Sequence, residues 1–147
     1  GVALVRAVGD RYARAGRIWN HVECGDHYYR AMCSWTTLLA ATGFKVDIPG
    51  GIVTVAPVIR AADVRAPWVA ATAWGSLEQG ARRLALACRT GSITFRQLRV
   101  NLPGRSFTAR LGAKALPCTV TEANGYRAID FGAPITLAAR QSLLITG

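Results

Sequence analysis

The pattern of apolar residues changes at about Lys45, and this change constrains the fold more than any other feature of the sequence. Before it, apolar side chains recur every three or four residues, which is typical of helices. After it, short runs rich in β-branched and aromatic residues are separated by turn residues, which is typical of strands. The 147-residue chain is therefore predicted to hold helices in residues 1–45 and a β-rich region in residues 46–147.

The first helical segment covers residues 1–17 and is predicted to be amphipathic. Gly16 suits the left-handed backbone that follows the last turn of many helices. The apolar face consists of Leu4, Val5, Val8 and Tyr12.

The second helical segment is apolar on one face and small on the other. Asp26 suits its N-cap and Gly43 suits its end. The apolar positions are Tyr28, Ala31, Met32, Trp35, Leu38, Leu39 and Thr42. The small positions are Cys33, Ser34, Thr37 and Ala41. A helix that neighbours can approach from both sides is typical of the inner layer of a double-layered helical barrel, and a two-helix surface layer is the open alternative.

The remaining hundred residues predict an antiparallel sheet or sandwich, so that the chain as a whole is α+β. Asn124–Gly125 supplies the positive backbone angles of a tight hairpin turn, and Thr90–Gly91 is predicted to join two strands. The predicted strands are Ile52 to Val55, Trp68 to Ala73, Leu84 to Arg89, Ser92 to Val100, Phe107 to Leu111, Thr119 to Glu122 and Tyr126 to Phe131.

The formal charge of +10 raises the question of a nucleic-acid partner, because clustered cations bind phosphate backbones. Of the 18 basic residues, Lys45 and Lys114 are lysines, and 18 minus 2 leaves sixteen arginines. These arginines are scattered, with Arg82-Arg83 as one adjacent pair. The scatter argues against a nucleic-acid partner and favours solvated arginine side chains.

The cysteines and the absence of long apolar runs bear on the cellular compartment. Cys24, Cys33, Cys88 and Cys118 lie far apart and do not indicate a disulfide framework, so we expect a reducing, cytoplasmic location. An export signal lost upstream is the open alternative, because the sequence begins with Gly1 inside a helical pattern, as a piece of a longer chain would. No stretch approaches the roughly 18 consecutive apolar residues of a membrane-spanning helix.

One segment between the predicted helices is richer in reactive and hydrogen-bonding groups than any other. Residues 19–30 read WNHVECGDHYYR and contain both histidines of the chain. A loop that precedes a helix is a common place for a rigid scaffold to present polar groups to a ligand. Trp19 is predicted to stack on a sugar ring, while Asn20, Asp26 and Arg30 address its hydroxyls.

The longer segment WNHVECGDHYYRAMCSW, from Trp19 to Trp35, resembles the signature near the end of glycoside hydrolase family 116. That family includes bacterial β-glucosidases and non-lysosomal glucosylceramidases. The resemblance continues weakly to Pro57 and through Ala73-Trp74-Gly75. It implies that residues 1–45 are two helices from the end of an (α/α)6, or six-hairpin, glycosidase barrel, and that the antiparallel β region of residues 46–147 follows them.

The resemblance implies hydrolysis of β-glycosides with retention of configuration and no cofactor or metal. Retaining enzymes use two carboxyl groups about 5 to 5.5 Å apart. In the family, the nucleophilic glutamate and the acid/base aspartate both precede the signature, so neither is expected in this chain. The expected partners are a glycoside and the upstream part of the same chain, and this fragment alone is expected to be inactive.

The resemblance also implies roles for individual residues of the signature. An arginine at the position of Arg30 holds sugar hydroxyls in the family, although an ion pair with Asp26, four residues earlier, would equally suit it. His21 stands where the better-known β-glucosidases have a glutamate that contacts the sugar. Because an imidazole both donates and accepts, glucose specificity is open. Glu23 is a candidate contact that could instead support Arg30.

Two other chemical interpretations of the same segment remain open. His21, Cys24 and His27, with Cys33 or Asp26, are residue types that bind zinc, although a second ligand pair at typical spacing is missing. Cys24 and His27 could also form a thiolate nucleophile and its base.

The competing functional hypothesis assigns the function to the β region, as a non-catalytic carbohydrate-binding or scaffold module. Trp68 and Trp74 are the aromatic residues that would bind a sugar in such a module. Because they flank a run of small residues, we expect both to fill an interface instead.

Overall fold

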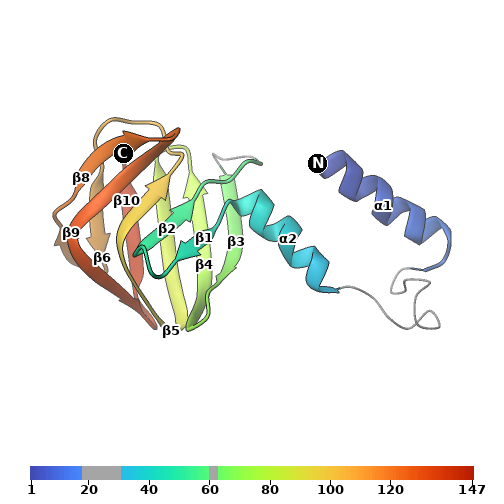
Figure 1. The fold of residues 1–147 in the computed structure, drawn as a ribbon, viewed down its shortest axis with the longest axis horizontal. Coiled ribbons are helices and arrows are strands. Elements are labelled where there is room, and N and C mark those ends of the chain that lie inside the picture. Colours follow the sequence, from blue (N-terminus) through green and yellow to red (C-terminus); the bar gives the residue numbers. More distant parts are fainter. Residues whose placement is uncertain (18–30, 60–62) are drawn as a thin grey trace. The chain divides into compact units, whose positions relative to one another are not determined.

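The computed structural model describes residues 1–17, 31–59 and 63–147 (Figure 1). The chain forms two compact units, Gly1–Thr37 and Leu38–Gly147. No helix in these ranges is long and apolar enough to cross a bilayer.

The predicted first helix is confirmed as α1, Val2–Arg14. Gly16 has a φ of 69°, as expected for the residue that ends the last turn. The apolar face of α1 is exposed: the side chain of Leu4 is 71% exposed, and no residue of α1 is buried against the rest of the described chain.

The second helix, α2, spans Ala31–Thr42, so the predicted N-cap at Asp26 lies outside the described residues. Its end is confirmed at Gly43, where φ is 57°. Thr42 is buried, and its hydroxyl donates to the carbonyl oxygen of Leu38 at 2.9 Å. The amide of Val58 donates to the carbonyl of Ala41 at 3.1 Å, so the last turn of α2 is bonded to the β structure that follows.

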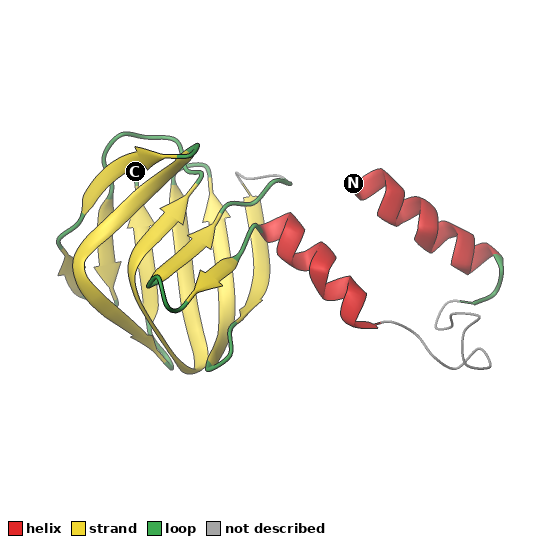
Figure 2. Cartoon of the chain, viewed as in Figure 1, coloured by secondary structure: helices red, strands yellow, loops and turns green. Residues whose placement is uncertain are grey.

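The rest of the second unit is a mixed sheet of ten strands within the described residues (Figure 2). The first five strands are β1 (Lys45–Asp47), β2 (Ile52–Val55), β3 (Asp63–Val69), β4 (Ala73–Gly80) and β5 (Arg83–Val100). The other five are β6 (Thr108–Leu111), β7 (Lys114–Leu116), β8 (Thr119–Ala123), β9 (Tyr126–Ala138) and β10 (Ser142–Thr146).

The long strand β5 belongs to two layers. Its first half pairs with β4 and β10, and its second half pairs with β2 and β9. The β2–β5 pairing is parallel, whereas the other strand pairs of the described sheet are antiparallel. Gly91, at the point where β5 changes partners, has a φ of 75° and passes so close to the carbonyl of Thr72 that a side chain would overlap it.

The hydrophobic core lies between these two layers and is formed by alternate residues of their strands. Phe44, next to β1, stacks on Trp68 of β3 with ring centroids 5.5 Å apart. Phe95 of β5 and Phe131 of β9 meet edge to face at 6.2 Å. Such aromatic pairs each add roughly 0.5–1.5 kcal/mol beyond the burial of their surface. The buried cluster runs from Phe44 to Ile145, so the second unit has a core of its own.

The predicted fold class is wrong. The chain is mainly β, with two short helices in its described part, and is not the end of an (α/α)6 barrel followed by an antiparallel region. The helical periodicity was read correctly in residues 1–17 and 31–42, but periodicity identifies a helix and not the architecture around it. The inner barrel position was predicted for the second helix, and the last turn of α2 is instead bonded to β structure, through the Val58 amide and the Ala41 carbonyl.

Several local predictions can also be compared with the strands. The Asn124–Gly125 hairpin is confirmed: it joins β8 to β9, with φ values of 52° and 79°. The predicted β2 has the observed bounds. Thr90–Gly91 does not join two strands, because it lies inside β5. The predicted strand from Trp68 to Ala73 contains the end of β3, the turn at residues 70–72 and the first residue of β4.

Candidate functional site

The predicted sugar-binding residues all lie in residues 18–30, which are outside the described part of the chain. They are Trp19, Asn20, His21, Glu23, Asp26 and Arg30. The cysteine–histidine and zinc alternatives fall in the same segment. These assignments stay predictions.

The helix that continues the signature is anchored at its C-terminal end. Leu39 is exposed on α2, whereas Thr42 and Phe44 are buried. The Thr42 hydroxyl also accepts a hydrogen bond from the Phe44 amide at 3.3 Å. Together with the bond from the Val58 amide to the Ala41 carbonyl, this contact joins the C-terminal end of α2 to the β structure that follows.

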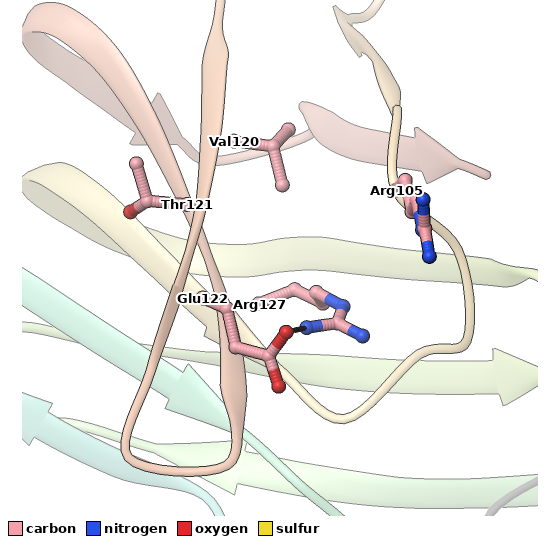
Figure 3. Close-up of a pocket in the computed structure, with 5 residues that line it drawn as sticks. All are labelled: Arg105, Val120, Thr121, Glu122 and Arg127. Carbon is pink, nitrogen blue, oxygen red and sulfur yellow. Dashed lines mark ion pairs between the residues drawn. The ribbon is translucent and has the colours of Figure 1, made fainter.

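A polar hollow of about 320 Å³ lies beside the β8–β9 hairpin (Figure 3). Glu122 and Arg127 are cross-strand partners and form an ion pair, and Arg127 Nε donates to the carbonyl of Gly104 at 2.9 Å. Arg105 lies on the loop across the hollow (Figure 3). Because Glu122 already neutralises Arg127, the hollow is a weak anion site, and its polar groups are mainly satisfied by one another.

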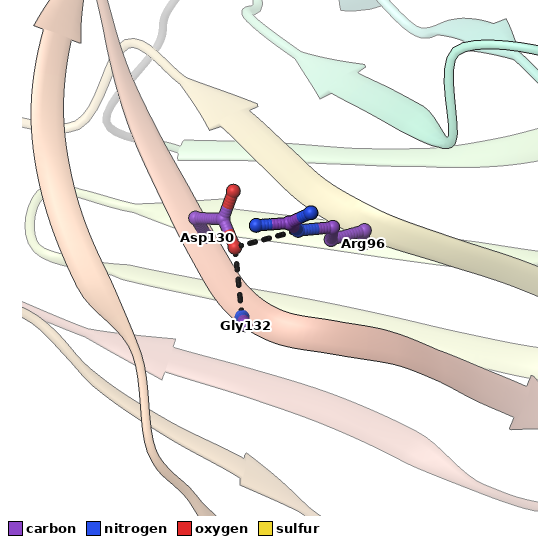
Figure 4. Close-up of polar contacts among 3 residues, drawn as sticks. All are labelled: Arg96, Asp130 and Gly132. Atoms are coloured by element: carbon purple, nitrogen blue, oxygen red, sulfur yellow. Dashed lines mark hydrogen bonds and ion pairs between the residues drawn. The ribbon is translucent and has the colours of Figure 1, made fainter.

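Asp130, on the outer side of the β5–β9 pair, is held as an ionised carboxylate by two polar contacts (Figure 4). Asp130 Oδ1 accepts hydrogen bonds from the Gly132 amide at 2.7 Å and from Arg96 Nε at 3.1 Å. The bond from the Gly132 amide, followed by the bond from the Arg96 side chain, lowers the pKa of Asp130. A general acid needs a raised pKa, so Asp130 is suited to holding β9 against β5 and not to proton donation.

The two cysteines of the β unit have thiols that are poor nucleophiles. Cys88 is buried and its Sγ lies 3.4 Å from the carbonyl oxygen of Thr90. Burial raises the pKa of Cys88 and of Cys118, so at neutral pH both are protonated. Cys88 therefore behaves as a small buried hydrophobe of the core.

The two tryptophans of the β3–β4 hairpin differ in environment. Trp68 is 1% exposed, and its Nε1 donates to the carbonyl of Ala87 at 3.0 Å. Trp74 is 50% exposed. Trp68 is buried, as the expectation that both side chains fill an interface requires. Trp74 is half exposed within this unit and does not meet that expectation there. The alternation of Trp74, Ser76 and Glu78 with apolar neighbours was the sequence signal that could have shown this.

Within residues 1–17, 31–59 and 63–147, no group of three or more His, Cys, Asp or Glu side chains is arranged to hold a metal ion. The sequence matches no protein-family model, and a comparison with curated proteins found no significant match.

Proposed function

We propose that this chain is the C-terminal segment of a retaining glycoside hydrolase that acts on β-glycosides and is related to β-glucosidases and glucosylceramidases of family 116. The observation that carries the proposal is the segment from Trp19 to Trp35, whose order of residue types resembles the family signature. The proposal concerns the sugar pocket and does not include a helical barrel, because the chain is mainly β.

In this proposal, residues 19–30 bind the sugar. Arg30 is the principal contact, since its planar guanidinium can bond two neighbouring hydroxyls at once. His21 would discriminate among sugars, and Trp19 would stack on a ring face. Asn20, Glu23 and Asp26 would complete the polar lining.

The catalytic carboxylates are proposed to lie outside this chain. Two acids of the β unit are already engaged: Glu122 pairs with Arg127, and Asp130 pairs with Arg96. Ion pairing stabilises the ionised form of a carboxylate, whereas the acid/base group of a retaining glycosidase must carry a proton in the first step. Asp130, whose pKa is lowered by its bonds to the Gly132 amide and Arg96, therefore does not fit that role.

The test is hydrolysis of a panel of chromogenic β-glycosides by the full-length natural protein. Arg30→Ala is expected to lower kcat/KM about thirty-fold, corresponding to roughly 2 kcal/mol of lost transition-state stabilisation. Arg6→Ala is the matched control, because Arg6 lies on the exposed surface of α1. His21→Glu is expected to change the order of preference among the sugars. Absence of hydrolysis of every glycoside would overturn the proposal.

A second candidate is that the β unit is itself a non-catalytic carbohydrate-binding or scaffold module. The observation in its favour is that the core from Phe44 to Ile145 belongs entirely to the second unit. Retained glycan binding by the chain after Arg30→Ala, together with absence of hydrolysis, would favour this candidate.

A further inference from the structure

The outer surface of the β3–β4–β5 layer combines an exposed aromatic side chain, small side chains and charged groups. We call this surface the tryptophan face. It consists of Arg65, Val69, Trp74, Ser76, Glu78 and Ala87. These residues point away from the core because they alternate with buried residues of the same strands.

Trp74 is held in place by strand pairing on both sides. Its cross-strand partners are Val69 on β3 and Thr90 on β5, and the register of the β4–β5 pair shifts directly after it. Such irregularities re-aim side chains and are common next to binding sites. Val69 is 52% exposed and Trp74 is 50% exposed, so the two form a small apolar patch.

The surface next to Trp74 is not raised by long side chains, because the residues at the neighbouring outward positions have small side chains. Ser76 pairs with Ala87, which in turn pairs with Ser142 on β10. In the next row, Glu78 pairs with Arg65 on one side and with Ala85 on the other. On β4 the outward position between Trp74 and Glu78 is Ser76, whose partners are Pro67 and Ala87, so a ligand that stacks on Trp74 can continue over short side chains as far as Glu78.

Charged groups surround a hollow of about 140 Å³ at the other end of the face, near Arg65 and Glu78. Asp63 and Arg83 also line it. Glu78 lies four positions after Trp74 on β4, which corresponds to about 14 Å at the rise of an antiparallel strand. An aromatic surface and a polar hollow are thus aligned along one strand over the length of a short oligosaccharide.

We propose that the tryptophan face binds a neutral glycan chain, with Trp74 stacking on one pyranose ring and Arg65 and Glu78 bonding the hydroxyls of another. The choice of a β-linked glucan as the ligand class rests on the proposed function. An indole presents an apolar face to the C–H groups of a sugar ring, and mixed donors and acceptors suit hydroxyls. A protein partner fits less well, because the cores of protein interfaces are depleted in charged residues.

The inference is tested by measuring binding of the 147-residue chain to cellohexaose by calorimetry and to soluble β-glucan by affinity electrophoresis. Trp74→Ala is expected to weaken binding at least about tenfold, and Trp74→Phe to retain part of it. Glu78→Gln tests the polar end and is expected to weaken binding to cellohexaose. Ile48→Ala is the matched control, because Ile48 is an equally exposed apolar residue outside this face.

The outcomes separate this inference from the proposed function. Hydrolysis of small chromogenic glycosides by the full-length natural protein is expected to be unchanged in Trp74→Ala and lowered in Arg30→Ala. If the chain binds neither glucan, or Trp74→Ala binds both as the unmodified chain does, the glycan-binding face is overturned whether or not hydrolysis is observed. Binding that falls steeply with salt would show attraction of a polyanion by the arginines and would also overturn it. Loss of self-association in Trp74→Ala, without glycan binding, would identify a contact between copies instead.

Discussion

The two sides of the β3–β4–β5 layer are built from the same three strands and differ in what their side chains do. On the inner side, Trp68, Leu77 and Leu86 are almost completely buried. On the outer side, Trp74 and Glu78 are exposed. Because successive residues of a strand point to opposite faces, a shift of one position converts a structural tryptophan into one that is free to meet a ligand.

The position of the inner tryptophan, Trp68, also depends on the absence of a side chain at one position of the neighbouring strand. Trp68 is on β3, yet its indole nitrogen reaches the carbonyl of Ala87 on β5. It does so past Gly75 of β4, where a Cβ would overlap the Ala87 carbonyl oxygen and lie 2.8 Å from Trp68 Nε1. The buried indole N–H therefore has a hydrogen-bond acceptor. A buried N–H without one would cost about 1–3 kcal/mol.

The largest effect is expected for Trp68→Ala. Removal of this buried ring, which also stacks on Phe44, should lower the free energy of unfolding by about 3–5 kcal/mol in urea denaturation. Trp68→Phe keeps most of the volume and loses the hydrogen bond to Ala87, so a smaller loss of roughly 1–3 kcal/mol is expected. Equal effects of Trp68→Ala and Trp74→Ala would break the distinction between the two sides.

The next largest effect is expected at Gly75, where the strand has no side chain. Gly75→Ala should destabilise the β unit by roughly 1–3 kcal/mol, because the added methyl group meets the backbone of Ala87 and the Trp68 indole. Gly80→Ala on the same strand is the control, since its Cβ would have only ordinary contacts. A Gly75→Ala variant as stable as Gly80→Ala would show that the Trp68 indole does not need the space left by the missing side chain at Gly75.

A smaller, pH-dependent effect is expected at Asp130, on the outer side of the other layer. Its pKa is lowered in the folded protein, so its contribution to stability is present above the unfolded pKa and is lost as the pH falls through the folded pKa. Asp130→Asn should therefore lower the urea midpoint at pH 7, and the difference should shrink below about pH 4. A difference that is constant with pH would contradict this account.

The smallest effect on stability is expected for Trp74→Ala, within about 0.5 kcal/mol of the unmodified protein. Half of this side chain is already exposed, so little buried surface is lost. Denaturation midpoints for Trp74→Ala and Val69→Ala would sharpen the comparison, and a loss above about 2 kcal/mol would place Trp74 with the structural residues.

Local features of the fold were predictable because they depend on neighbouring residues. Gly16 and Gly43 end the helices, and Asn124–Gly125 makes the β8–β9 turn, since each adopts backbone angles that other residues disfavour. The β3–β4 turn was missed because Val69 to Thr72 contain no glycine or proline, and Thr72 is instead held by a hydrogen bond from its hydroxyl to Ser92 on β5. That partner lies twenty residues away and cannot be inferred from a local pattern.

The candidate site was only partly accessible from the sequence. The resemblance in residues 19–30 predicts groups that would bind a sugar, and substitutions such as Arg30→Ala test that prediction. The sequence named Trp74 as a residue of the alternative carbohydrate-binding module but led us to expect it in an interface, because its neighbours on the tryptophan face are set by the register of β4 between β3 and β5.

The sequence by itself determined the change from helical to strand periodicity near Lys45, the helix ends at Gly16 and Gly43, and the tight turn at Asn124–Gly125. Only the tertiary structure decided that the chain is mainly β, that β5 is one strand shared by two layers, and that Trp68 is inside while Trp74 is outside. The physical reason is that backbone preference acts between adjacent residues, whereas burial is decided by partners that are distant in the chain, as Trp68 and Ala87 are.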